Sequence, residues 1–248
     1  MPLPLRNRTA IVTGASRGIG RDIALKLGAM GAAVVVNYVN EAAGASAVCA
    51  EIAASGGQAL PVRGDMRRLS DIAAMVDRTI EQFGALNILI NNAGVFLYKS
   101  IAEISEEEFD DIFAINVKGL FFACQQAALK MADGGAIINV SSSVTKAMLP
   151  MYGAYAATKG AVEQITKVLA KELGPRKIAV NAISPGPVDT DLFRQGKTEQ
   201  QIAQLAKMAA YGRIGTPLDI ANAVAFLVSA EAGWITGQNV CVNGGFIA

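Results

Sequence analysis

Tyr155 and Lys159 are the two side chains of this sequence best suited to proton transfer. They lie in residues 152–173, whose apolar spacing predicts a helix, so the phenol and the ammonium four residues later share one face. A free tyrosine loses its proton only near pH ~10, and a neighbouring cation stabilises the phenolate. We therefore expect Lys159 to lower the pKa of Tyr155 and to make it a proton donor near neutral pH. The alternative is a surface lysine beside a half-buried tyrosine, because this spacing also occurs by chance.

The composition narrows the chemistry that the other residues can perform. None of the 248 residues is a histidine, which excludes a Ser-His-Asp site, a Cys-His site and any histidine-ligated zinc, and we expect no metal. A net charge of +1, with scattered Lys and Arg, gives no footprint for nucleic acid. No apolar run has the length of a membrane span, and the first residues lack the apolar core of a signal peptide. We therefore expect a cytoplasmic protein, bound to neither membrane nor nucleic acid, with reduced thiols at Cys49, Cys124 and Cys241.

The elements that must position Tyr155 alternate between strands and helices along the chain. Strands are predicted near residues 8–13, 33–38, 58–62, 86–90, 136–140, 177–183 and 238–242. This alternation predicts an α/β fold: a doubly wound parallel sheet of about seven strands with helices on both faces. No repeat or linker divides residues 1–248, so we expect one domain. The more polar segment 189–212 is expected to form a lid over the substrate. On the tyrosine helix the buried face is expected at Ala161, Ile165, Val168, Leu169 and Leu173.

A glycine-rich turn follows the first predicted strand and opens a helix. Gly14, Gly18 and Gly20 give the spacing G-x-x-x-G-x-G, which differs from G-x-G-x-x-G but obeys the same physics. Small residues let the backbone approach a pyrophosphate, and the helix N-terminus offers free N–H groups. A tight turn with no ligand is the alternative, and the position after the first strand favours the dinucleotide site.

The end of the second strand bears on the choice of cofactor. Dinucleotide-binding folds often carry an acid there for the adenosine ribose, yet this sequence has none until Glu41. Arg17 lies in the glycine loop instead, and a cation without a nearby acid favours a 2′-phosphate. We therefore expect NADP(H) rather than NAD(H), the alternative being that Arg17 is a solvated loop charge.

Other polar residues come at strand ends or on an apolar helix. The stretch Asn91-Asn92-Ala93-Gly94 follows one strand and Ser141-Ser142-Ser143 follows another. Ligands of open α/β sheets bind at this edge, although asparagines can also brace a sheet and serines often cap a turn. Asn116 is polar on the apolar helix that follows the capping box at Ser105, either as a packing hydrogen bond or as a residue near a buried site.

Taken together, the sequence resembles the short-chain dehydrogenase/reductase family over essentially its whole length. Six motifs occur in the family's order: Thr13-Gly14-x-x-x-Gly18-x-Gly20, Asn91-Asn92-Ala93-Gly94, Asn116, Ser142 thirteen residues before the tyrosine, Tyr155-x-x-x-Lys159, and Pro185-Gly186 with Thr190. The resemblance implies a single-domain Rossmann fold and an enzyme that moves a hydride between NADP(H) and a carbonyl or secondary alcohol.

The resemblance also implies a catalytic tetrad. Tyr155 would give its proton to the substrate carbonyl oxygen, and Ser142 would orient that oxygen. Lys159 would lower the pKa of Tyr155 and bind the nicotinamide ribose, while Asn116 would hold a water that relays protons to Lys159. Cofactor contacts are expected from Gly14, Ser16, Arg17, Gly18, Ile19, Gly20, Asn37, Tyr38, Asp65, Met66, Asn92, Ala93, Gly94, Tyr155, Lys159, Pro185, Gly186, Val188 and Thr190.

Within the family the sequence is most similar to the 3-oxoacyl-acyl-carrier-protein reductase group, on the glycine loop 14–20 and the segment 212–217. This implies a carbonyl or acyl thioester substrate and a homotetramer. An acyl-carrier partner would need a basic docking surface, with candidates at Lys99, Lys130, Lys146 and Arg194. Reductases of other ketones or sugars, and a dinucleotide-binding sensor without catalysis, stay open as alternatives.

Overall fold

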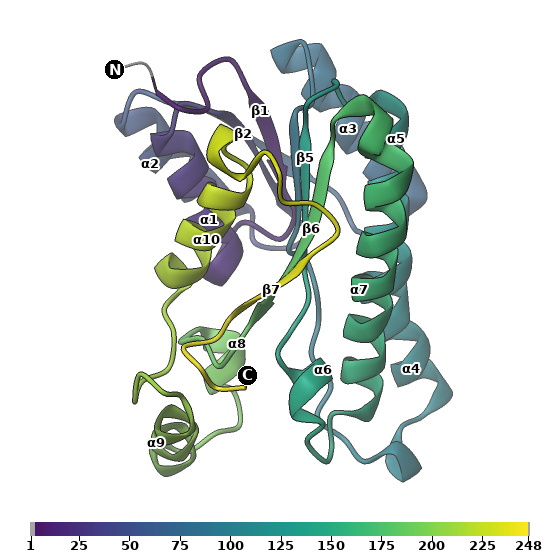
Figure 1. The fold of residues 1–248 in the computed structure, drawn as a ribbon, viewed down its shortest axis with the longest axis vertical. Helices are drawn as coiled ribbons and strands as arrows, with labels where there is room; N and C mark the ends of the chain where they lie inside the picture. Colours follow the sequence, from purple (N-terminus) through teal and green to yellow (C-terminus); the bar gives the residue numbers. More distant parts are fainter. Residues whose placement is uncertain (1–2, 248) are drawn as a thin grey trace.

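A single sheet of seven parallel strands forms the centre of the molecule, in the order β3-β2-β1-β4-β5-β6-β7. The structure is a computed structural model that describes residues 3–247. Helices α1, α2 and α10 cover one face of the sheet, and α3, α5 and α7 cover the other (Figure 1). The predicted fold class, a doubly wound Rossmann-type α/β domain, is therefore confirmed.

The seven strands begin and end close to where the apolar pattern places them. The strands are β1 (Thr9–Val12), β2 (Ala33–Tyr38), β3 (Gln58–Arg63), β4 (Ile88–Asn91), β5 (Ala136–Val140), β6 (Ala179–Pro185) and β7 (Asn239–Val242). The α-helices are α1 (Gly18–Ala29), α2 (Ala42–Ala54), α3 (Leu69–Phe83), α4 (Glu106–Phe113), α5 (Leu120–Lys130), α6 (Val144–Ala147), α7 (Gly153–Leu173), α8 (Asp191–Arg194), α9 (Glu199–Met208) and α10 (Pro217–Leu227).

The strand order reverses direction between β1 and β4, which are hydrogen-bonded neighbours. From β1 the chain winds outward through β2 to β3, then crosses back and continues from β4 to β7. In open parallel sheets, ligands bind where the winding reverses, beyond the carboxyl ends of the strands. The glycine loop after β1 and the Asn91–Gly94 stretch at the end of β4 therefore lie together at the edge where a cofactor is expected.

The long helix expected after Ser105 differs from the prediction. Ser105 and Glu108 form the expected capping box, but residues Ala114–Gly119 form a π-helical turn between α4 and α5. Apolar spacing does not distinguish a π turn from an α turn, whereas π turns often occur at functional sites. Asn116 lies on this turn and is 1% exposed.

Two further expectations about helix surfaces need correction. Val168 is 57% exposed, and the buried stripe of α7 instead follows Val162, Thr166, Leu169 and Leu173. The helical stretch Glu106–Lys130 is long and apolar enough to cross a membrane by composition alone, contrary to the expectation that no run reaches that length. Its buried side chains, such as Ala123 and Ala127, pack in the core formed with the sheet.

Candidate active site

The glycine loop between β1 and α1 is shaped to receive a phosphate group. Gly14 has φ +62°, a conformation that side chains other than glycine rarely adopt. A Cβ on Gly20 would lie 2.4 Å from the carbonyl oxygen of Gly14 and 2.5 Å from Nδ2 of Asn92, so only glycine fits there. Asn92 Nδ2 also donates to the carbonyls of Thr13 and Gly14, which ties this loop to the end of β4. The first turn of α1 carries no acidic residue, which leaves its positive dipole end open to an anion.

A cleft of about 970 Å³ runs from this loop across the carboxyl ends of the strands. Fifteen of the nineteen residues expected to contact the cofactor line it, namely Gly14, Ser16, Arg17, Gly18, Ile19, Gly20, Tyr38, Asp65, Met66, Asn92, Ala93, Gly94, Tyr155, Lys159 and Thr190. Its size, its glycine cradle and the open helix end fit a dinucleotide.

Four of the nineteen lie elsewhere. Asn37 is 1% exposed, and its side chain accepts from Gly14 N and donates to the carbonyls of Val62 and Gly64. It is a buried brace for the glycine loop and does not line the cleft, contrary to the prediction. The other three line the smaller cavity next to the cleft, namely Pro185, Gly186 and Val188.

The adenosine end of the cleft is rich in arginine. Arg17 lies 3.8 Å from Glu41, and Arg63, Arg67 and Arg68 reach the same cleft from the end of β3 and the loop that follows it. Only Arg17 is foreseen from the sequence. Arg63, Arg67 and Arg68 lie near Arg17 because β3, β2 and β1 are neighbours in the sheet. The linear sequence does not show this strand order.

Of the three serines after β5, only Ser142 faces Tyr155. Ser141 Oγ donates to Glu163 and Ser143 Oγ donates to the carbonyl of Ser184, and both serines are buried. Ser142 is partly exposed to the cavity, and its hydrogen bond with Tyr155 acts to lower the pKa of that phenol. The geometry therefore separates Ser142 from its neighbours, as the spacing of thirteen residues suggests.

The pKa of Tyr155 is raised in this structure and not lowered. Burial is the largest influence and raises the pKa of Tyr155 to about 12, against the opposing hydrogen bond from Ser142. Burial likewise lowers the pKa of Lys159 to about 8. Lys159 Nζ lies 5.6 Å from the centroid of the Tyr155 ring and donates to the carbonyl of Val140 at 2.8 Å. The expected direction of the Tyr155 shift is thus wrong for the protein by itself, because spacing along a helix says nothing of desolvation.

Asn116 braces the loop after β4. Its Oδ1 accepts from the backbone N–H of Val95 and its Nδ2 donates to the carbonyl of Val95, both at 2.9 Å. The same Nδ2 lies 3.2 Å from Thr158 Oγ1 on α7. These bonds couple the π turn to the helix that carries Tyr155 and Lys159. The role of Asn116 in holding a water stays a prediction.

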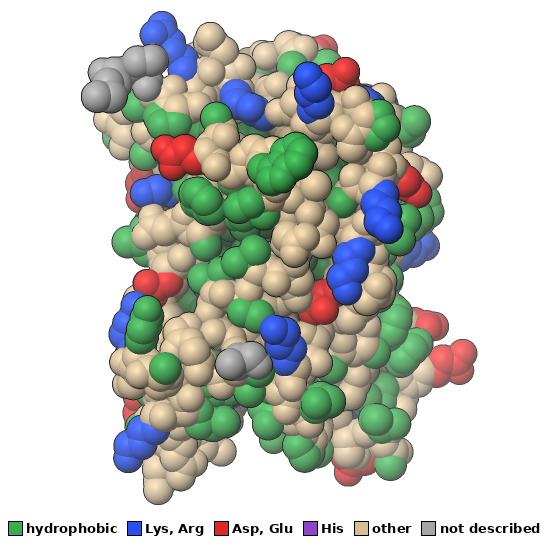
Figure 2. Space-filling model, viewed as in Figure 1, with side chains coloured by type: hydrophobic (Ala, Val, Ile, Leu, Met, Phe, Trp, Pro, Cys, Tyr) green, Lys and Arg blue, Asp and Glu red, His purple; other side chains and the backbone are tan. Residues whose placement is uncertain are grey.

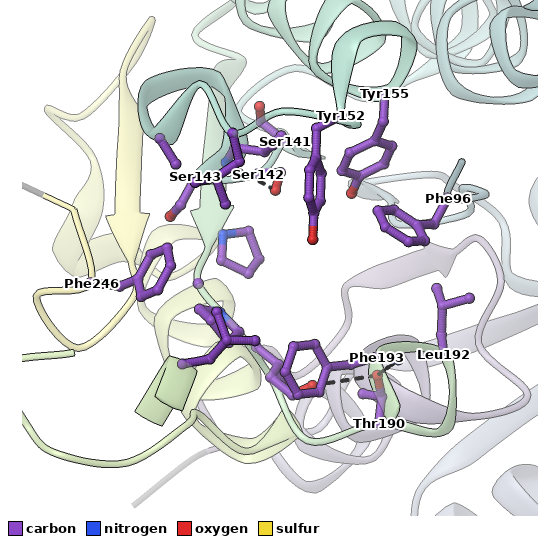
Figure 3. Close-up of a pocket in the computed structure, with 18 of the residues that line it drawn as sticks. Phe96, Ser141, Ser142, Ser143, Tyr152, Tyr155, Thr190, Leu192, Phe193 and Phe246 are labelled. Carbon is purple, nitrogen blue, oxygen red and sulfur yellow. Dashed lines mark hydrogen bonds between the residues drawn. The ribbon is translucent and has the colours of Figure 1, made fainter. Parts of the chain in front are cut away.

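A smaller cavity of about 190 Å³ adjoins Tyr155. The ring of Tyr152, the residue before α7, and the ring of Tyr155 on α7 enter it beside Phe96, while Phe193 and Leu192 of α8 approach from the opposite side (Figure 3). Phe96 meets the Tyr155 ring edge-on at 5.2 Å between centroids. In the space-filling view a notch separates the α9 side of the molecule from the α6–α7 side, and charged side chains are scattered over this face (Figure 2).

Comparison with known proteins shows the family to which this chain belongs. A family model described as enoyl-(acyl carrier protein) reductase matches residues 14–247. An uncharacterised oxidoreductase from Methylorubrum extorquens is 44% identical over 243 residues, which are 97% of this chain and 98% of that protein. The chain belongs to the short-chain dehydrogenase/reductase family. An NADPH-dependent aldehyde reductase-like protein from Arabidopsis thaliana is 41% identical over 260 residues, covering 99% of this chain and 96% of the relative.

A solved structure has the same fold over nearly its full length. The crystal structure of angucycline C-6 ketoreductase LanV with bound NADP matches with a TM-score of 0.93 at 39% identity, covering 98% of this chain and 96% of that chain. The protein is therefore an oxidoreductase of the short-chain dehydrogenase/reductase family, whose cofactor is a nicotinamide dinucleotide.

The family motifs leave the walls of the substrate cavity unassigned. Phe96, Tyr152 and Phe193 line it, yet none belongs to a motif recognised in the sequence. Tyr152 precedes Tyr155 by about one helical turn, and this spacing is the only sequence feature that points to it. Phe96 lies in the loop after β4 and Phe193 in the short helix α8, and the local sequence does not fix where either side chain points.

Proposed function

We propose that this protein is an NADP(H)-dependent reductase of ketones or aldehydes, with Tyr155 as the proton donor. The observation that carries the proposal is the position of Tyr155. It borders both the dinucleotide cleft and the smaller cavity, so one phenol reaches the cofactor side and the substrate side. A binding protein without catalysis has no need of a proton donor at that junction.

Each residue of the tetrad has a task that its surroundings support. Ser142, the one serine of three that faces Tyr155, orients the substrate oxygen. Tyr155 transfers its proton to that oxygen, and its raised pKa keeps the phenol protonated at neutral pH. Lys159 lines the cleft, where a bound ribose and a developing phenolate would both lie close to its ammonium. When bound, the nicotinamide supplies the hydride.

The preference for NADP(H) over NAD(H) is part of the proposal. Four arginines line the adenosine end of the cleft, and no carboxylate precedes Glu41 after β2. An arginine binds a phosphate through short, charge-assisted hydrogen bonds, whereas the ribose 2′-hydroxyl of NAD is usually held by a carboxylate.

Reduction of 3-oxoacyl thioesters is the finer proposal that the sequence suggests. The docking surface for an acidic carrier protein has little support, because three of its four candidate cations are paired. Lys99 binds Glu108, Lys130 binds Asp77, and Arg194 binds Asp189 and Glu199. We therefore expect a free thioester, if accepted at all, to be reduced about as well as the same group on a carrier protein.

A substrate panel with both cofactors tests the proposal. The oxidation of NADPH and of NADH is followed by absorbance with aldehydes, simple and aromatic ketones and a 3-oxoacyl thioester. Turnover of any carbonyl with NADPH preferred supports an NADP-dependent reductase. NADPH binding without turnover of any member would contradict it and favour the sensor.

A homotetramer and a lid over residues 189–212 complete the proposal. Two groups of exposed apolar side chains support assembly: Leu218, Phe226 and Trp234 near α10, and Phe121, Leu129 and Val168 on α5 and α7. Light scattering after gel filtration should give four times the chain mass, and a monomer would contradict this. The lid is supported by Leu192, Phe193 and Leu205, which line the cavity from α8 and α9.

A further inference from the structure

Lys197, between α8 and α9, is the one charged side chain among the described residues that line the substrate cavity. The other lining side chains are aliphatic, aromatic or neutral hydroxyls. Lys197 Nζ lies 4.8 Å from the centroid of Phe193 and 5.6 Å from that of Phe96, and it donates to the carbonyl of Phe193 at 2.8 Å. An ammonium group is thus held at the aromatic wall of an otherwise uncharged cavity.

No carboxylate within residues 3–247 forms a salt bridge with Lys197. Of the three acids nearest to it in sequence, Asp189 and Glu199 both bind Arg194, and Asp191 forms no salt bridge with Lys197 in the part of the chain that the structure describes. An ammonium has three N–H donors, and one protein acceptor is identified for this one. Partial burial also lowers the pKa of Lys197, as expected for a cation without an anionic partner. An anion beside Nζ would offset that desolvation.

Phe96 relates this cation to the reacting centre. One edge of the cavity runs from Tyr155 to Phe96, whose ring centroids are 5.2 Å apart, and from Phe96 to Lys197 Nζ. A substrate whose carbonyl oxygen meets Tyr155 and whose body lies along Phe96 would therefore bring its far end to Lys197. Among the described residues, Phe96 is thus the one ring that contacts both Tyr155 and Lys197, so a substrate body that lies along it and meets both groups would have about the length of one such ring.

We propose that Lys197 binds an anionic group on the substrate, and that the preferred substrates are ketones with a carboxylate about one ring away from the reacting carbonyl. This inference rests on the proposed reductase function of the same cavity. A charge-assisted hydrogen bond is strengthened where water is partly excluded, and an ammonium on a flexible stem adapts to a carboxylate. The competing role for Lys197 is a latch that holds the lid against Phe96 through cation–π contacts.

The test compares 4-acetylbenzoate with its methyl ester, which have the same shape near the ketone. The ratio of their kcat/KM values is measured for the wild type and for Lys197→Met, so that the intrinsic reactivity of each ketone cancels between proteins. We expect the acid-to-ester ratio to fall roughly tenfold or more in the variant, as for a lost hydrogen bond between charged groups. Lys197→Arg should keep most of the preference. Lys207→Met, which removes an exposed lysine of α9 outside the cavity, should leave the ratio unchanged.

The outcomes separate this inference from the function on which it rests. If the acid-to-ester ratio of kcat/KM is unchanged in Lys197→Met, including the case in which both ketones lose activity equally, anion binding is overturned. Lys197 would then act only as the latch that holds the lid against Phe96. NADPH affinity, measured in parallel, shows whether the variant is folded. If neither of these ketones nor any other carbonyl of the panel is turned over, the reductase proposal fails. In that case the Kd of 4-acetylbenzoate is measured by calorimetry with NADPH present. Anion binding by Lys197 requires weaker binding to Lys197→Met than to the wild type, and equal binding would overturn it.

Discussion

Two substitutions of opposite effect test the cofactor preference at the adenosine end of the cleft. Arg17 precedes the first residue of α1, and its guanidinium lies 3.8 Å from the carboxylate of Glu41. The two side chains are 68% and 57% exposed, so the pair is weak and open to exchange. A 2′-phosphate would take the place of Glu41 beside Arg17. Arg17→Ser therefore removes a charge that attracts the 2′-phosphate of NADPH. Glu41→Gln removes a carboxylate that competes with this phosphate for Arg17 and repels it.

The size of each effect follows from the exposure of the pair. Two unit charges about 4 Å apart attract by ~1 kcal/mol in bulk water and by ~4 kcal/mol at an effective dielectric constant of ~20. Since Arg17 is mostly exposed and other arginines remain, we expect Arg17→Ser to cost about 1–2 kcal/mol, or roughly five- to thirtyfold in the Kd of NADPH. An exposed ion pair contributes ~0–1 kcal/mol, so Glu41→Gln should tighten NADPH by at most about fivefold.

Fluorescence titration of both variants with NADPH and with NADH measures these changes. The Kd of NADH should move by less than about twofold in each variant, because NADH lacks the 2′-phosphate. Lys167→Ser, which removes an exposed positive charge from α7 outside the cleft, controls for the change in net charge. An equal weakening of both cofactors by Arg17→Ser would show that Arg17 binds a group common to both. A loss of NADPH affinity in Glu41→Gln would refute the competition between carboxylate and phosphate.

Three further predictions concern the cleft and the buried lysine. Gly20→Ala places a Cβ 2.4 Å from the Gly14 carbonyl oxygen; strain of ~1–3 kcal/mol should raise the KM of NADPH roughly tenfold or more. Adding Tyr38→Asp to Arg17→Ser should improve kcat/KM with NADH, and no gain would contradict the account of the adenosine end. Burial holds the Lys159 pKa at about 8 rather than 10.5, so the unfolded chain binds more protons between these values. Denaturant titrations should therefore show the free energy of unfolding rising from about pH 8 to about 10, and Lys159→Met should flatten that rise.

The parts of the site that depend on local geometry could be predicted from the sequence. Tyr155 and Lys159 share a helix face because the period of an α-helix requires it. Gly14 and Gly20 follow a buried strand and open a helix, and the structure gives each a conformation or a contact that excludes larger residues. Ser142 was favoured by spacing alone, and its neighbours prove to be buried and bonded elsewhere.

The parts that depend on tertiary packing could not be predicted. The sign of the Tyr155 pKa shift is set by desolvation, which spacing does not encode. Asn37 lies one residue before the end of β2, where the sequence predicts a cofactor contact, yet its side-chain amide forms its hydrogen bonds with the surrounding backbone. Arg63 reaches the adenosine end because β3 is a neighbour of β2 in the sheet. Lys197 reaches the cavity because of the path of the chain between α8 and α9. The π turn at 114–119 has the same apolar pattern as the α-helix around it.

The central claim is that Tyr155 donates the proton in carbonyl reduction. The most direct test is the rate of NADPH oxidation by Tyr155→Phe with the best ketone of the panel. The control is Tyr152→Phe, which removes the other phenol that lines the cavity. The account predicts that Tyr155→Phe lowers kcat/KM by roughly 10²–10⁴-fold with the Kd of NADPH nearly unchanged, and that Tyr152→Phe retains most activity. Turnover by Tyr155→Phe at the wild-type rate would contradict it.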